Sequence, residues 1–220
     1  MSSTNTLKAT VLEAAFIAGI KDRDMNRFID ESILPEELFE IKNGRFFGPL
    51  ACVFASFYMR EQRLSKPARL EVVKELTRRI ASVGKATGST FFSSSLELDS
   101  WVVDMDLLSV NIAKYVSEVR PRIEQISKVD GMVSIDENVL GGEPVFSGTR
   151  VPVRTIAAWV DSGESHDAIK KSFPSVSNEM IDAAPLWVKT HPQRGRPKSF
   201  GDLNPEWKIV SKKRVSLTDA

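Results

Sequence analysis

The side chains of this 220-residue chain that are best suited to chemistry are cations and amides that could contact nucleic acid. Four of them lie close together near the amino terminus: Lys21, Arg23, Asn26 and Arg27. Arginine and asparagine carry paired hydrogen-bonding groups that match the major-groove edges of guanine and adenine. Lys42 and Arg45 follow and could meet phosphate. The pattern predicts a DNA-binding surface. The alternative is a solvated helix face, because four acids between positions 22 and 31 dilute the positive charge.

Residues typical of catalysis or metal binding are scarce. The single cysteine, Cys52, sits in an apolar run and is expected to be buried rather than nucleophilic. The two histidines, His166 and His191, have no neighbour at metal-ligand spacing and are expected at the surface. The chain contains no Gly-x-Ser-x-Gly elbow and no pattern typical of a catalytic triad. We therefore expect a binding protein, not an enzyme, with no cofactor and no metal site.

The elements that must position the amino-terminal cations are two short helices. Thr10 and Glu13 have capping-box spacing and predict a helix over residues 11–18. A break follows at residues 19–21, and apolar residues at helical spacing predict a second helix over residues 23–32, with Asp22 as its N-cap. This arrangement is typical of a helix-turn-helix and leaves the four polar residues outward.

A hairpin is predicted next, because Asn43-Gly44 stands between the apolar runs at residues 38–41 and 45–47. Helix, turn, helix and hairpin together resemble the winged helix of the MerR and excisionase type. That resemblance implies that the second helix enters the major groove of DNA and that the hairpin, as a wing, touches the backbone through Lys42 and Arg45.

Apolar helices over residues 50–58 and from residue 65 onward are expected to complete a first domain, residues 1–83. Residues 84–89 have the composition of a linker. Residues 84–129 are then expected to hold this linker, a hairpin and a helix. The hairpin strands are predicted at 90–98 and 101–112, and the helix at 113–128.

The stretch Val-Leu-Gly-Gly-Glu-Pro-Val-Phe-Ser-Gly-Thr-Arg-Val-Pro-Val, residues 139–153, is the most distinctive in the chain. Gly141 and Gly142 permit a tight turn, and short strands are predicted at residues 145–146 and 151–153. No phosphate-binding glycine pattern is present. The glycines are therefore expected to shape a hairpin, and an anion nest is the alternative.

With Phe173-Pro174 and the helical patterns around it, this stretch resembles the domain of unknown function 433 over residues 130–191. That family consists largely of predicted antitoxins of the VapB class, encoded beside PIN-like ribonuclease toxins. Three helices are expected, over residues 155–162, 165–173 and 177–190, with Pro185 predicted to kink or end the last one.

This trihelical domain is not expected to read DNA, although three helices again resemble a helix-turn-helix. Asn178, Glu179 and Asp182 lie near the start of its third helix, and carboxylates there repel phosphate. The domain is instead expected to dimerise or to hold a partner, with Arg150 and Arg154 as exposed cations.

Positive charge gathers in the tail, residues 192–220, because from Lys189 onward eight cations oppose three acids while the whole chain carries only +1. An anionic partner is expected. The preferred one is the acidic active site of a PIN-like toxin, contacted through basic and apolar anchors: Arg194, Arg196, Lys198, Phe200, Trp207 and Ile209. The alternative is a DNA minor groove, since residues 194–197 resemble an AT-hook.

The fold class expected from these elements is α+β and mostly α: an amino-terminal winged helix-turn-helix, a central β-hairpin and helix, a trihelical domain and a basic tail. No apolar run approaches the ~20 residues that a bilayer requires, so a cytoplasmic protein without membrane contact is expected. We predict an antitoxin that binds a PIN-like toxin protein and operator DNA, as a homodimer or a larger toxin-antitoxin hetero-oligomer. The alternative functions are a stand-alone transcriptional regulator and a scaffold with no nucleic-acid role.

Overall fold

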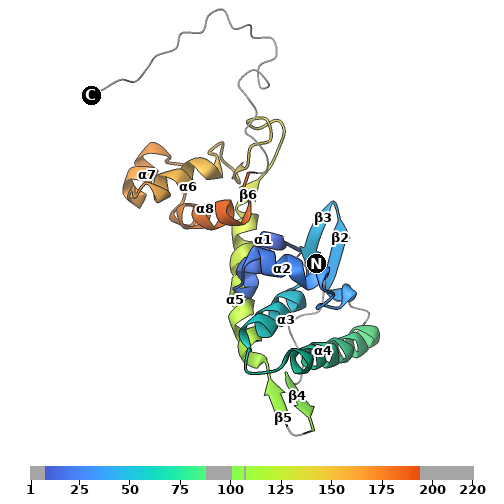
Figure 1. The fold of residues 1–220 in the computed structure, drawn as a ribbon. Helices are drawn as coiled ribbons and strands as arrows, with labels where there is room; N and C mark the ends of the chain where they lie inside the picture. The colour runs from blue at the N-terminus through green and yellow to red at the C-terminus, as the bar shows by residue number, and fades with distance from the viewer. Residues whose placement is uncertain (1–7, 88–100, 107, 194–220) are drawn as a thin grey trace, which may run out of the picture.

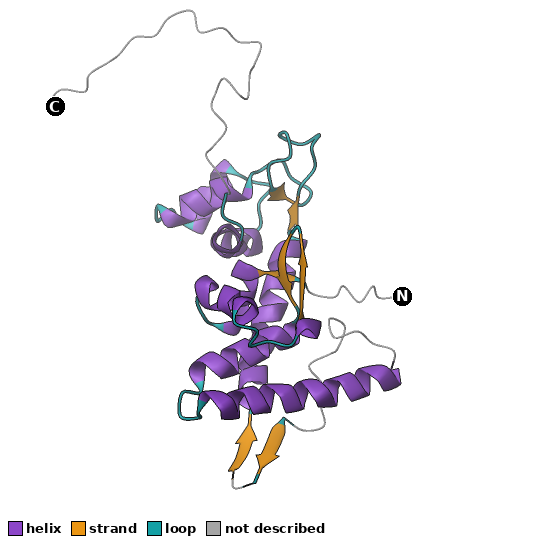
Figure 2. Cartoon of the chain, turned by 45° about the vertical axis from the view of Figure 1, so that its right-hand side comes forward, coloured by secondary structure: helices purple, strands orange, loops and turns teal. Residues whose placement is uncertain are grey.

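The computed structural model describes residues 8–87, 101–106 and 108–193 (Figure 1). The fold is α+β and mostly α, as the sequence predicted, with helices making up most of the described chain and strands confined to small sheets (Figure 2).

The first two helices lie where the sequence placed them. Helix α1 (Val11–Ala18) begins with the predicted capping box: the Thr10 backbone N–H donates to Glu13 Oε2 at 2.6 Å. It ends at Gly19, whose φ of 68° suits a residue without a Cβ. Helix α2 (Asp22–Asp30) starts one residue earlier and ends two residues earlier than expected, so Lys21, not Asp22, is its N-cap residue.

The predicted hairpin is confirmed. Strands β2 (Phe39–Lys42) and β3 (Gly44–Phe47) pair antiparallel around Asn43, after the 3-10 helix Glu36–Leu38. Strand β1 (Ala9–Thr10) adds to the other edge of β3, giving the sheet order β1-β3-β2. The sheet therefore connects the start of α1 directly to the hairpin.

Four further elements complete this part of the molecule: α3 (Pro49–Arg60), α4 (Lys66–Thr87), the β4–β5 hairpin (Val102–Met105 and Leu108–Asn111) and α5 (Ala113–Gly131). Helix α3 is almost wholly buried, and its Cys52 is buried as expected; burial raises the pKa of that thiol far above its usual range.

The domain division differs from the expectation. Helix α4 continues through the predicted linker to Thr87. Val103, Val110 and Ile112 share one hydrophobic core with α1, α2 and α3. Within the described residues, the β4–β5 hairpin and α5 as far as Ile126 therefore pack with the first core, whereas Val129 packs with the carboxyl-terminal helices.

The central hairpin is also built differently. The predicted strand at residues 101–112 is itself a hairpin, because the chain turns after Asp106, which has a φ of 26°. The strand expected at residues 90–98 lies outside the described residues.

The carboxyl-terminal part contains the two-stranded sheet of β6 (Val133–Ser134) and β7 (Val145–Phe146), followed by α6 (Val153–Asp161), α7 (His166–Ser172) and α8 (Asn178–Thr190). The three predicted helices are confirmed.

Three details of this part differ from the expectation. Strand β7 pairs mainly with β6, and the predicted strand at 151–153 is a single bridge between Val145 and Pro152, because α6 begins at Val153. Of the two outcomes expected at Pro185, the early helix end is contradicted: α8 continues to Thr190, because buried Ile181, Ala184 and Trp187 hold it on both sides of the proline.

Two hydrophobic cores meet along α5. Val119 and Ile126 of α5 belong to the first core, and Val129 belongs to the core of α6, α7 and α8. Figure 1 shows α5 running from the β4–β5 hairpin to the carboxyl-terminal helices. Helix α8 contacts both α5 and α1, so the two parts pack against one another.

Candidate functional site

The predicted DNA-contacting residues of α2 lie on an open helix face. The only buried residues of α2 are Met25 and Phe28. Lys21, Arg23 and Arg27 are exposed, and Asn26 is half-buried. The face that points away from the core therefore carries the three cations, as the sequence predicted.

Acids surround these cations without burying them. Arg27 lies 2.8 Å from Glu31 and 3.7 Å from Asp24, and the Arg23 guanidinium lies 3.9 Å from Asp24. Exposed ion pairs of this kind stabilise by only about 0–1 kcal/mol, because water and salt screen them. A phosphate or a base edge could therefore replace the acid partners.

Arg45 lies in a different environment from the expected contact with phosphate. From β3, its guanidinium donates to the backbone oxygen and Oδ1 of Asn26 at 3.2 and 3.0 Å, and to Asp30 Oδ1 at 2.6 Å. Arg45 therefore fixes the hairpin against α2, and it occupies the amide oxygen of Asn26. Lys42, at the hairpin tip, is exposed and lies 3.3 Å from Glu40.

The start of α8 is acidic and exposed, as expected. Glu179 lies 3.5 Å from Lys128, and Asp182 lies 3.3 Å from His166, which is at the surface as predicted. These contacts join α8 to α5 and α7.

Arg154 is not the exposed cation that the sequence suggested. It donates to the His191 backbone oxygen at 2.6 Å, and its guanidinium lies 5.4 Å from the centre of the Trp187 ring. The helix C-terminus and the indole face both attract a cation, which explains why Arg154 is drawn inward. Arg150 is exposed.

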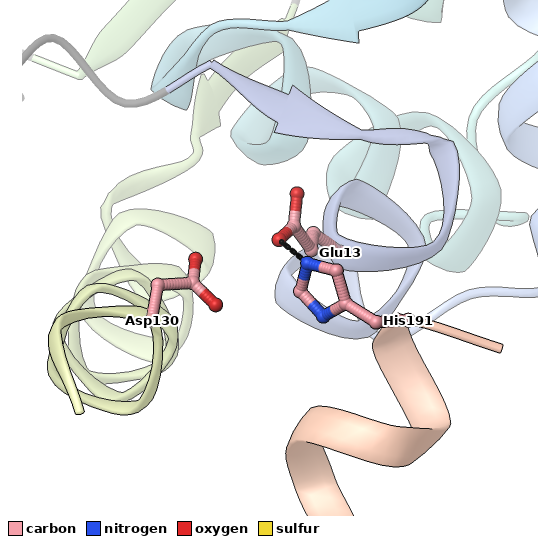
Figure 3. Close-up of side chains that lie close together, drawn as sticks. All are labelled: Glu13, Asp130 and His191. Atoms are coloured by element: carbon pink, nitrogen blue, oxygen red, sulfur yellow. Dashed lines mark ion pairs between the residues drawn. The ribbon is translucent and has the colours of Figure 1, made fainter. Parts of the chain in front are cut away.

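His191 is the largest departure from the sequence-based expectation. Its Nε2 lies 3.2 Å from Glu13 Oε1, and Asp130 faces both side chains (Figure 3). One potential ligand atom from each of these three residues lies within 4.8 Å of the others. His191 was expected at the surface with no ligand neighbour at metal spacing in the sequence, but it is half-buried and its carboxylate neighbours come from distant parts of the chain.

We call Glu13, Asp130 and His191 the interdomain cluster. They come from α1, the end of α5 and the residue after α8, so no local spacing in the sequence could reveal them. The one local signal, Glu13 in a capping box, has a sufficient explanation in helix capping alone.

The three side chains influence one another's pKa values. The hydrogen bond to Glu13 raises the pKa of His191. Although burial opposes ionisation of Glu13, its bonds to His191 and Thr10 lower its pKa overall. Burial, followed by repulsion from Glu13, raises the pKa of Asp130 to about 6. At neutral pH the cluster thus gathers two carboxylates around one imidazole.

The tail residues predicted to bind a toxin, from Arg194 to Ile209, lie outside the described residues. Among the helices that the structure describes, none is long and apolar enough to cross a membrane.

Comparison with known proteins adds two relationships. Residues 133–186 match the family described as "Protein of unknown function (DUF433)", and they include β6, β7, α6, α7 and the first part of α8. The chain is 35% identical over 211 residues to the "Uncharacterized protein y4eO" of Sinorhizobium fredii, and the match covers 96% of this chain and 92% of that protein. No solved structure matches the chain significantly. The chain therefore belongs to the family of the uncharacterized protein y4eO and carries a DUF433 domain in its carboxyl-terminal part.

Proposed function

We propose that this protein is the antitoxin of a type II toxin-antitoxin system: it binds its own operator through α2 and the β2–β3 hairpin and neutralises a PIN-like ribonuclease toxin. The observation that carries the DNA-binding part is the open face of α2, where Arg23 and Arg27 are exposed beside a hairpin that Arg45 holds in place. The toxin-binding part is supported by the DUF433 resemblance and by the basic composition of residues 192–220.

The geometry of α2 suits the major groove. A helix with side chains is about 10–12 Å wide, which is close to the groove width of about 12 Å. Arg23 and Arg27 are four residues apart, so they project from the same side of α2. The hairpin packs beside this helix and presents Lys42 at its tip, where a winged helix contacts the backbone.

The acids around α2 favour a DNA interaction that depends on a correct fit. Each phosphate or base contact must replace an existing ion pair, such as Arg27 with Glu31. Non-specific binding, which depends on net positive charge, is correspondingly weak. A dimer would gain affinity by placing two α2 helices in successive major grooves, about 34 Å apart.

The first test is binding to DNA from the upstream region of the protein's own gene, measured by gel shift and footprinting at several salt concentrations. The double variant Arg23→Ala/Arg27→Ala is expected to lose about 10- to 100-fold in affinity and its footprint. The matched control is Lys170→Ala/Lys171→Ala, which removes two exposed cations from α7. Equal losses in both double variants would contradict recognition through α2.

The toxin interaction is tested by co-expression with the product of the adjacent gene, scoring growth and co-purification. The full chain is compared with a chain ending at Gln193, which retains all of α8 and His191. Rescue and complex formation that vanish with residues 194–220 support the antitoxin. If the product of the adjacent gene is neither toxic nor bound, the stand-alone regulator is favoured, because DNA binding through the exposed arginines of α2 would need no protein partner.

A further inference from the structure

We propose that the interdomain cluster of Glu13, Asp130 and His191 is a binding site for one divalent transition-metal ion, of the Zn²⁺ or Mn²⁺ type, that joins the DUF433 domain to the first domain. One imidazole nitrogen and two carboxylate oxygens are a donor set that both ions accept. The proposal is independent of the proposed antitoxin function.

The imidazole of His191 is oriented as a metal-ligating histidine is. Its Nδ1 lies 3.2 Å from the Trp187 backbone oxygen. Nδ1 also lies 3.1 Å from the Thr190 hydroxyl oxygen, which can donate or accept. Because a carbonyl oxygen only accepts, the contact with Trp187 favours a hydrogen on Nδ1, and in that tautomer the lone pair of the neutral ring lies on Nε2, the nitrogen nearest Glu13. The ring also stacks on Trp187, with centres 4.5 Å apart and planes 7° from parallel. A backbone acceptor on the second nitrogen is the usual arrangement for a histidine ligand.

Glu13 is held in a comparable way. Its Oε2 accepts the Thr10 backbone N–H at 2.6 Å, so Oε1 is the oxygen that faces His191. The side chain is only 6% exposed. The capping box of α1 thus fixes the rotamer of the carboxylate and leaves one of its oxygens available.

Asp130 supplies an independent observation, an unpaired buried oxygen. Its Oδ1 is buried and accepts no hydrogen bond from any described residue. The residue also sits near the carboxyl end of α5, where the helix dipole disfavours a negative charge. A buried carboxylate oxygen without a partner is costly, and a cation between Asp130, Glu13 and His191 would satisfy it.

The geometry requires little adjustment. Donor atoms around a tetrahedral Zn²⁺ at about 2.0–2.2 Å are about 3.4 Å apart. The Glu13–His191 distance is 3.2 Å, and all three donors lie within 4.8 Å of one another. A small rotation of Asp130 toward the pair shown in Figure 3 would complete a three-residue site with room for one further ligand.

The test uses the untagged full-length chain, stripped with a chelator and titrated with ZnCl₂ or MnCl₂ by calorimetry. One site per chain is expected for at least one of these ions. Free metal at about 100 times its Kd is expected to raise the Tm by about 5–10 °C. Co²⁺ serves as a spectroscopic probe, because a tetrahedral site gives it strong visible absorption. No binding of either Zn²⁺ or Mn²⁺ would overturn the proposal.

Three variants locate the ion. His191→Gln and Asp130→Asn are expected to weaken binding at least tenfold, whereas His166→Gln, which alters the other histidine of the chain, is expected to retain it. Asp130→Asn keeps the shape of the side chain, so it reports on the site even if His191→Gln disturbs the fold. Unchanged affinity in both ligand variants would place the ion elsewhere. A metal-indifferent chain that Asp130→Asn stabilises would show that a shared proton, not a metal ion, balances the cluster.

Discussion

Helices α2 and α8 each end a helix-turn-helix-like arrangement, yet they are placed very differently. Helix α2 has two buried residues among nine and lies at the edge of its core. Helix α8 has five among thirteen and lies between α6, α5 and α1. The exposed charges of the two helices also differ: α2 carries Arg23 and Arg27 among its acids, whereas α8 carries Glu179 and Asp182 near its start.

Two helices with the same position in a helical pattern can therefore differ in how much of their surface they expose. A recognition helix must keep one long face free and must present donors on it. Of these two helices, only α2 has both properties. Helix α8 instead packs against α1 and α5 and so connects the DUF433 domain to the first part of the molecule.

The largest effect is expected from removing the anchor of α2. Phe28 is buried and meets the Tyr58 ring edge-on at 5.5 Å, so Phe28→Ala should cost about 3–5 kcal/mol of unfolding free energy, measured by denaturant titration. Ile181→Ala, in α8, should cost about 2–5 kcal/mol. The two variants should also differ in operator affinity under native conditions: Phe28→Ala should reduce it, and Ile181→Ala should leave it unchanged. Identical operator binding by both would break the distinction between the helices.

Arg45 allows a sharper comparison, because among the described residues no hairpin is bonded to α8 as β2–β3 is to α2. Arg45→Ala should cost about 1–2 kcal/mol of stability through the lost bonds to Asn26 and Asp30. It should also lower DNA affinity several-fold. Arg45→Lys keeps the charge but not the forked geometry, so it should rescue neither property. Two results together would instead assign Arg45 to a direct contact with the DNA backbone. Arg45→Lys would fully restore DNA affinity, and the salt dependence of DNA binding by Arg45→Ala would correspond to about one phosphate contact fewer.

A smaller effect on stability is expected when the pH is changed in the metal-free chain, where His191, the residue after α8, contacts Glu13 of α1. The raised pKa of His191 means that its contribution to stability is complete below its unfolded pKa and is lost as pH rises through the folded value. The raised pKa of Asp130, about 6, acts in the same direction. The Tm in chelator should therefore fall between pH 5 and pH 8.

His191→Gln should flatten this slope, and His166→Gln should leave it unchanged. An unaltered slope in the first variant would exclude His191 as its source.

The smallest effect should come from the ion pair of Lys128 and Glu179, whose charged atoms lie 3.5 Å apart and whose side chains are both exposed. Exchanging the two residues should change stability by less than about 0.5 kcal/mol. A larger loss in thermal unfolding would mean that α8 is oriented by surface charge as well as by its apolar face.

Local signals in the sequence predicted the elements well. The capping box at Thr10 and the Asn43-Gly44 turn each depend on neighbouring residues, and both appear as expected. The cations of α2 were found for the same reason. Long-range pairing had no such signal: the inward turn of Arg154 and the Glu13–His191 contact depend on how α8 packs against α1. The linker predicted at residues 84–89 was based on composition alone, and α4 continues through its first part to Thr87, because a single glycine weakens a helix without having to end it.

Helix α5 sets the rotational orientation of the carboxyl-terminal helices relative to the first core, because it packs against both. Ile126 and Val129 lie about one helical turn apart and belong to different cores, so one continuous helix connects the two cores. Each residue of an α-helix advances about 1.5 Å and turns about 100°. A single insertion between these two positions would therefore swing the DUF433 domain about a quarter of a turn and pull His191 away from Glu13, whereas the same insertion in a loose tether would be absorbed.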